Sequence, residues 1–299
     1  MIPLFDLHCD TLEEMFLGKY SFTSSPLHIS LSKCNKYSPY IQIMAIWSDY
    51  RLSPKDAYKR YNDTISYAQR QGLSFLKDFK NLSEHSYILS VEGAEIIEND
   101  LQRLDRLKND GVKVITLFWR DMNLLGGAWN TDIALSEFGI EFIKKCFELS
   151  IIPDISHASE QASHDIIKLA KSENKTIIAS HSNSYSICRH KRNLHDDTFK
   201  DIIDLDGLVG ISLSSQHLHL NGDAKICDIL KHIYHYLSLG GINTICLGCD
   251  FDGVAALPDG IRDISDLSKL YRELEINFGS KIADKIFFHN AYNFFQINY

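Results

Sequence analysis

The chain alternates between short apolar runs and longer amphipathic segments. Eight runs are rich in apolar residues and have the length of buried strands. In most of the segments between them, apolar residues recur with helical spacing, most clearly in residues 57–79, 136–150 and 227–241. The predicted strands are residues 3–8, 40–47, 87–92, 112–119, 151–157, 176–181, 208–213 and 244–250.

This alternation predicts an α/β fold, namely a (β/α)8 TIM barrel. Near-continuous apolar strands are typical of a parallel sheet that is buried on both faces. An open, doubly wound sheet would show the same alternation, but no Gly-x-Gly-x-x-Gly motif follows the first strand, so its dinucleotide-binding form has no support. Nothing resembles a linker, and we expect one domain over residues 1–299, with residues 252–263 as its most loop-like stretch.

Composition narrows the class of protein. The net charge is −8, so the chain lacks the excess of basic residues that nucleic-acid-binding proteins have. Its seven cysteines are scattered along 299 residues, which argues against the disulfide framework of a small secreted protein. Cys246 and Cys249 lie within one predicted strand without a second such pair, so we interpret them as packing thiols. No charged leader opens the chain, and no apolar run reaches the about 18 residues that span a bilayer. We therefore expect a cytoplasmic protein.

Polar side chains gather at the ends of the predicted strands, where a barrel places its active site. His8 and Asp10 follow the first strand, and in extended chain their side chains share a face while Cys9 points the other way. Taken singly, each such residue has a structural alternative, such as a helix cap or a satisfied polar group at a strand end. Together, six metal-competent residues end five of the strands: His8, Asp10, Glu92, His157, His181 and Asp250.

Histidines combined with carboxylates favour zinc or another divalent first-row metal over magnesium. Five ligands exceed what one tetrahedral zinc needs, so we expect two Zn²⁺ that share a bridging carboxylate. Such a pair can hold a water and lower its pKa towards neutrality. Asp250 is the candidate for proton transfer. The pattern thus predicts a TIM barrel of the metal-dependent hydrolase type.

Five motifs, in this order, resemble the membrane (renal) dipeptidase family, in its soluble bacterial form: HCD, SVEGAE, DISHAS, SHSNSYSICRHKRN and LGCDFDG. The resemblance implies a binuclear zinc barrel that hydrolyses dipeptides, including those with a C-terminal D-residue. It implies that His8, Asp10 and Glu92 hold one zinc. Glu92 would bridge to the second zinc, which His157 and His181 complete.

The same resemblance assigns two further roles. Asp250 would be the catalytic acid/base, and Arg192 would bind the substrate carboxylate; the alternative for Arg192 is a solvated charge within a basic run. The signal peptide and lipid anchor of mammalian members are expected to be absent. We expect a dipeptide as the partner, no nucleic acid and no membrane, and the sequence leaves a homodimer open.

The chain departs from the family at one position. Mammalian members read Thr-Leu-Thr-His after the fourth strand, whereas this chain reads TLFW and places Trp119 there. An indole N–H can donate a hydrogen bond but cannot become a cation, and losing one stabilising donor can lower turnover on the order of 100–1000-fold. We expect Trp119 to contact the substrate and, because of its bulk, to favour small substrates. His217 and His219 are alternatives for the missing donor.

Two other functions fit the same residues. One is hydrolysis of another small amide or lactone that bears a carboxylate. The other is metal binding without turnover, and Asp250 argues against it because a pure binding site has no need of a proton shuttle.

Overall fold

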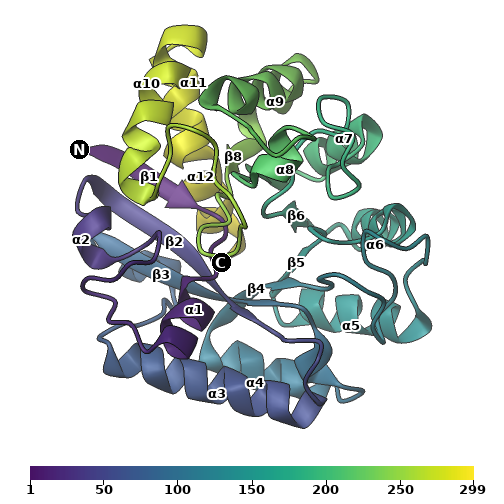
Figure 1. The fold of residues 1–299 in the computed structure, drawn as a ribbon. Coiled ribbons are helices and arrows are strands. Elements are labelled where there is room, and N and C mark those ends of the chain that lie inside the picture. Colours follow the sequence, from purple (N-terminus) through teal and green to yellow (C-terminus); the bar gives the residue numbers. More distant parts are fainter.

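Eight parallel strands close into a barrel in sequence order, with β1 beside β8, in the computed structural model of residues 1–299 (Figure 1). Each predicted strand is present, so the expected (β/α)8 barrel is confirmed. The strands are β1 (Ile2–Asp6), β2 (Tyr37–Trp47), β3 (His85–Glu92), β4 (Val112–Thr116), β5 (Ile152–Asp154), β6 (Ile178–Ala179), β7 (Leu208–Ile211) and β8 (Ile245–Leu247).

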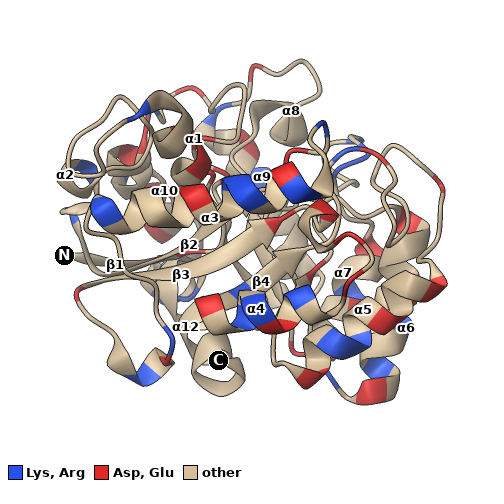
Figure 2. Cartoon of the chain, turned by 90° about the horizontal axis from the view of Figure 1, so that it is seen from below, with Lys and Arg blue, Asp and Glu red and all other residues tan.

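The helices surround the strands (Figure 1), and they bear most of the charged side chains while the visible strands have few (Figure 2). No helix combines the length and apolar character needed to cross a lipid bilayer. The helices are α1 (Thr11–Gly18), α2 (Leu31–Cys34), α3 (Pro54–Arg70), α4 (Gln102–Asp110), α5 (Glu137–Glu148), α6 (Glu160–Glu173), α7 (Asp196–Asp204), α8 (Ser215–Leu218), α9 (Ile226–Ser238), α10 (Leu267–Phe278), α11 (Ser280–Asp284) and α12 (Asn290–Asn298).

Helix α3 is shorter than its apolar periodicity predicts. Ser53 caps its start by accepting a hydrogen bond from the Asp56 N–H, and Pro54 occupies the first helical position. The expected end at residue 79 is wrong, because the helix stops at Arg70 and Gly72 turns the chain with a φ of 85°. The apolar residues beyond Gly72 belong to the segment that leads into β3.

The strands are buried on both faces, as their apolar composition predicts. One apolar cluster takes residues from every strand and therefore fills the barrel interior. Side chains at alternate strand positions, such as Leu4 and Met44, pack instead in the larger cluster that includes the helices. The strand residues of the inner cluster are Phe5, Ile41, Ile43, Ile88, Val114, Ile152, Ile178, Leu208 and Cys246.

Helix α12 closes one end of the barrel. Its residues Phe294 and Phe295 join the inner cluster, and Figure 2 shows the helix on the side of the molecule away from α1 and α8. The other end, where the strands terminate, is left for polar side chains. Cys246 packs in the inner cluster and Cys249 in the outer one, both as free thiols, so the interpretation as packing residues is confirmed.

Strands β6 to β8 approach each other closely just below that polar end. A Cβ at Gly210 or Gly248 would lie 1.9 Å or 1.7 Å from the carbonyl oxygen of Ser180. No side chain fits at either position, so glycine is required at both. This close approach fixes the backbone that precedes His181.

A single lysine, Lys113 on β4, is buried at the α12 end. Its side chain is 2% exposed, its Nζ donates to the Ser150 carbonyl over 2.8 Å, and the same Nζ lies 5.0 Å from the ring centroid of Tyr299. Burial lowers the pKa of Lys113 from 10.5 to about 7. The folded state therefore releases this proton more readily than the unfolded state does.

We expect Lys113 to make stability rise with pH between about 7 and 10.5, because only the unfolded state keeps the proton across that window. Lys113→Met should raise the melting temperature by roughly 2–6 °C near pH 6, and the gain should vanish near pH 10. Thermal melts across this range test it, with the exposed Lys144→Met as control. An equal gain in melting temperature at about pH 6 and pH 10 would show that the buried charge is not the cause.

Candidate metal centre and its cavity

His8 and Asp10 meet at the polar end of the barrel, just beyond β1. His8 Nε2 lies 3.4 Å from Asp10 Oδ2, while Cys9 between them packs in the outer apolar cluster. The predicted alternation of side chains therefore holds, although β1 itself ends at Asp6. Asp10 is the residue directly before α1.

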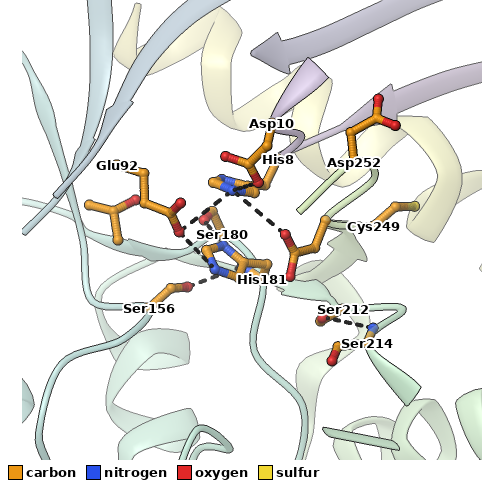
Figure 3. A network of polar contacts seen from close by, with 12 residues as sticks. His8, Asp10, Glu92, Ser156, Ser180, His181, Ser212, Ser214, Cys249 and Asp252 are labelled. Carbon is orange, nitrogen blue, oxygen red and sulfur yellow. Dashed lines mark hydrogen bonds and ion pairs between the residues drawn. The ribbon is translucent and has the colours of Figure 1, made fainter. Parts of the chain in front are cut away.

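Glu92 lies at the centre of the site. It is the last residue of β3, is 3% exposed, and places one carboxylate oxygen, Oε1, beside three imidazoles, of which Figure 3 labels those of His8 and His181. The Oε1 atom is 3.0 Å from His157 Nε2, 3.4 Å from His181 Nε2 and 3.7 Å from His8 Nε2. Strands that are distant in sequence thus bring the predicted ligands together around one carboxylate.

Two of the histidines are oriented through their second ring nitrogen. His157 Nδ1 lies 2.5 Å from the carbonyl oxygen of Trp119, which can only accept, so Nδ1 is the protonated nitrogen. His181 Nδ1 lies 2.8 Å from Ser180 Oγ. Their Nε2 atoms, 2.8 Å apart, face each other and Glu92. Partners of this kind fix the tautomer of a metal-binding histidine.

Asp154 supports this arrangement from below, and the sequence did not reveal it because it reads as part of an apolar strand. Its carboxylate is fully buried at the end of β5 and accepts hydrogen bonds from residues at the ends of three strands. Because Ser180 Oγ donates its only proton to Asp154, it accepts from His181 Nδ1. The donors to Asp154 are Thr116 Oγ1 (2.6 Å), Ser156 N (2.9 Å), Ser180 N (2.9 Å) and Ser180 Oγ (2.5 Å).

The two aspartates of the DFDG motif have different surroundings. Asp250 Oδ1 lies 3.9 Å from His8 Nε2, within the cluster. Asp252 points away from it (Figure 3) and accepts hydrogen bonds from Thr11 Oγ1 and the His28 N–H, each over 2.6 Å. Of the two, only Asp250 faces the predicted ligands.

The electrostatics of the cluster favour a bound cation. Burial raises the pKa of Asp250 well above its usual range, and the neighbouring carboxylates of Asp10 and Glu92 add to the effect. Burial opposes protonation of His8, yet Glu92, Asp10 and Asp250 outweigh it and raise the His8 pKa to about 10. His8 Nε2 and Asp10 Oδ1 are buried without a hydrogen-bond partner. Imidazole and carboxylate donors with unmet lone pairs fit a divalent first-row metal.

A cavity of about 440 Å³ opens above the cluster. Arg192 lines it with a side chain that is 5% exposed, and its Nε and Nη2 have no hydrogen-bond partner. Such burial rules out the alternative of a solvated charge. His217 also lines the cavity, whereas His219 does not and instead contacts Asp223, with 2.7 Å between Nδ1 and Oδ1. Other lining residues include Asp10, Trp47, Glu92, Trp119, Trp129, His157, His190 and Asp250.

The fold and the ligand cluster define a metal-dependent hydrolase built on a (β/α)8 barrel. Residues 1–296 match the family model of membrane dipeptidase, peptidase family M19. The chain therefore belongs to the membrane dipeptidase family, which confirms the resemblance of its motifs and the expected enzyme class, a metallo-dipeptidase.

Individual relatives agree with this membership. An uncharacterized protein in the pqqA 5′ region of Klebsiella pneumoniae is 30% identical over 216 residues, which are 68% of this chain and 78% of that protein. A Rhodobacter sphaeroides metallo peptidase, solved with a phosphinate mimic of the dipeptide L-Ala-D-Ala, has a TM-score of 0.88 at 20% identity, covering 100% of this chain and 99% of that one. A dipeptidase of family M19 has a TM-score of 0.89 at 21% identity, and the match covers 99% of this chain and 98% of that one. These two structures share the fold.

Asp154 generates a prediction about metal affinity. An amide offers one oxygen and adds two donors, so Asp154→Asn cannot accept the same four hydrogen bonds and should misorient His181. We expect zinc affinity, measured by competition with a chelating dye, to fall about 10–100-fold. Ser180→Ala removes the Oγ contacts to His181 and Asp154 but keeps the hydrogen bond from the Ser180 N–H to Asp154, and it should show part of this loss. Parental affinity in a folded Asp154→Asn protein would contradict the positioning role.

Proposed function

We propose that this protein hydrolyses dipeptides at a site that holds two zinc ions, with Glu92 bridging them. The observation on which the proposal depends is the convergence of three imidazole Nε2 atoms on one buried carboxylate, below a cavity with an unpaired buried guanidinium. His8, Asp10 and Glu92 would hold one ion. Glu92, His157 and His181 would hold the other.

Bound zinc polarises a peptide carbonyl and makes water acidic enough to supply a nucleophile near neutral pH. Proton transfer falls to Asp250, because it lines the cavity beside His8 and burial raises its pKa, so its carboxylate is a stronger base than usual. In this proposal Asp250 takes the proton of the attacking water and delivers it to the leaving amine. A carboxyl group with a raised pKa is suited to both halves of that task.

Arg192 anchors the free carboxylate of the substrate. Nε and Nη2, the two nitrogens without a partner, form one edge of the guanidinium and match the two oxygens of a carboxylate. This requirement for a terminal carboxylate favours dipeptides over internal peptide bonds. That a phosphinate mimic of L-Ala-D-Ala is bound in the Rhodobacter sphaeroides metallo peptidase supports acceptance of a C-terminal D-residue here.

Trp119 contacts the substrate from the side of β4, since its ring lines the cavity. It is neutral at any working pH, so polarisation of the carbonyl falls to the zinc ions, with His217 as an additional imidazole donor that reaches the cavity. Burial holds the pKa of His217 well below its usual range, which leaves a neutral ring with one N–H to donate.

Loss of the acid/base should separate metal binding from turnover. Zinc-loaded parental protein should contain about two zinc ions per chain and cleave L-L or L-D dipeptides. Asp250→Asn should keep the zinc but lower kcat by about 100–10 000-fold, because an amide cannot shuttle a proton. Elemental analysis and a dipeptide panel measure both, with the exposed Asp223→Asn as control. A single ion bound without Glu92 would refute the two-zinc site. A near-parental kcat in Asp250→Asn would refute the role of Asp250 as acid/base.

Arg192 should act through recognition of the terminal carboxylate. Arg192→Lys and Arg192→Ala should lower kcat/KM for free dipeptides by roughly 10–150-fold, the value of one charge-assisted hydrogen bond, because lysine cannot reproduce the two-pronged contact. The same dipeptides amidated at the C-terminus should lose far less. Arg189→Lys, an exposed arginine of the same loop, serves as control. Equal losses on free and amidated substrates would show that Arg192 does not read the carboxylate.

A further inference from the structure

Three aromatic side chains form a continuous surface on one side of the cavity. This aromatic wall consists of Trp47, Tyr50 and Trp119. The indoles of Trp47 and Trp119 have centroids 4.9 Å apart at an interplanar angle of 59°, and Tyr50 stacks on Trp119 with 5.5 Å between centroids. Trp47 and Trp119 both line the cavity. The wall combines the end of β2 with the loop after β4.

Charged contacts hold the wall in place. The Arg51 guanidinium lies 5.6 Å from the Trp47 ring centroid and pairs with both carboxylate oxygens of Asp49, over 2.7 Å and 2.8 Å. Asp49 also contacts Arg60 of α3 at 3.3 Å, and Arg60 contacts Glu13 of α1 at 3.2 Å. The loop that follows β2 is thus tied to two helices, so the wall exists before a substrate arrives.

The strand that ends in Trp47 of the wall lies across the barrel from the strand that precedes Arg192. In a closed barrel of eight strands in sequence order, β2 is diametrically opposite β6. Trp47 ends β2, whereas Arg192 follows β6, and the predicted metal ligands lie between them at the strand ends. A dipeptide with its carboxylate on Arg192 and its peptide carbonyl above Glu92 therefore extends its N-terminal residue towards the wall.

We infer that the aromatic wall binds the side chain of the N-terminal residue, so that the enzyme prefers dipeptides that begin with an aromatic or large apolar residue. The inference rests on the proposed dipeptidase function and on the role of Arg192. Apolar side chains gain by leaving water, and aromatic rings gain further by packing against other rings in tilted or stacked arrangements.

Basic side chains are the other class that aromatic faces attract. Here Arg51 already lies over Trp47, and Arg120 lines the same cavity beside Trp119. Arg51 thus already occupies the cation position at Trp47, and a lysine or arginine at the N-terminal position would meet Arg120 in the cavity, so the wall favours uncharged side chains.

Trp119 alone suggests the opposite order of substrates, since its bulk favours small ones. A cavity of about 440 Å³ lies within the range of small-molecule pockets and has room for a large side chain. The two expectations can be separated by experiment. If the bulk of Trp119 dominates, kcat/KM should be higher for Ala-Ala than for Phe-Ala; if the wall binds the side chain, the order should be reversed.

The test measures kcat/KM of the zinc-loaded enzyme on Ala-Ala, Leu-Ala, Phe-Ala and Lys-Ala, and on the reversed series Ala-Leu and Ala-Phe. We expect a Phe-Ala to Ala-Ala ratio of about 10 or more, with no comparable preference in the reversed series. Trp47→Leu and Trp119→Leu should each lower that ratio by about 5–10-fold, whereas Trp47→Phe, which keeps an aromatic ring, should retain most of it.

Trp129→Leu is the matched control. Trp129 lines the same cavity, but its ring lies 5.8 Å from that of His190 in the Arg192 loop, so the Phe-Ala to Ala-Ala ratio should not change. Far-ultraviolet circular dichroism and a cooperative thermal melt establish that each variant is folded.

The outcomes separate the two levels of the proposal. If no dipeptide is cleaved, the dipeptidase function itself fails. If dipeptides are cleaved with Ala-Ala as the best substrate, or if Lys-Ala is preferred, the inference about the wall is overturned and the function stands. A preference for Phe-Ala that survives both leucine variants, or that is lost equally in Trp129→Leu, also overturns it.

Discussion

The buried carboxylate of Glu92 is the constraint around which the polar end of the barrel is organised. An isolated carboxylate so deep in a protein is strongly unfavourable unless positive charge balances it. Here three imidazoles surround it, and Asp10 and Asp250 add further negative charge, so the cluster favours cations among its donors. Barrel closure is what brings β1, β3, β5 and β6 close enough to build this cluster.

The two histidines expected to share the second ion are oriented by different means. His181 depends on side chains, through Ser180 and Asp154, whereas His157 depends on the backbone carbonyl of Trp119. A carbonyl oxygen is present whatever side chain occupies that position. The chain can therefore carry tryptophan where mammalian members have histidine without disturbing the orientation of His157. In the proposed function, metal binding and substrate contact would thus be separated within a single residue, the first served by its backbone and the second by its ring.

The strands and the cluster were predictable because both follow from local pattern. Each candidate ligand comes at the end of an apolar run, and parallel strands in a barrel end at the same rim. Features that depend on contacts between distant segments were not visible. Asp154 reads as one more strand residue, and Trp47 ends a run that showed no ligand, so neither pointed to the site. His217 and His219 were equivalent in sequence, and only the fold turns one into the cavity and leaves the other with Asp223. Helix α3 was overextended because periodicity continues past the glycine that stops it.

The distribution of tryptophan gives the molecule a property unrelated to catalysis. The chain contains three tryptophans, and all three line the one cavity above the metal cluster. Light absorbed by indole alone is therefore emitted from the mouth of the site and from nowhere else in the molecule. Metal loading, ligand entry and movement of the surrounding loops all change the polarity around these rings, so unlabelled protein reports on its own site by its emission. Changes in the helices or at the α12 end remain silent in that signal.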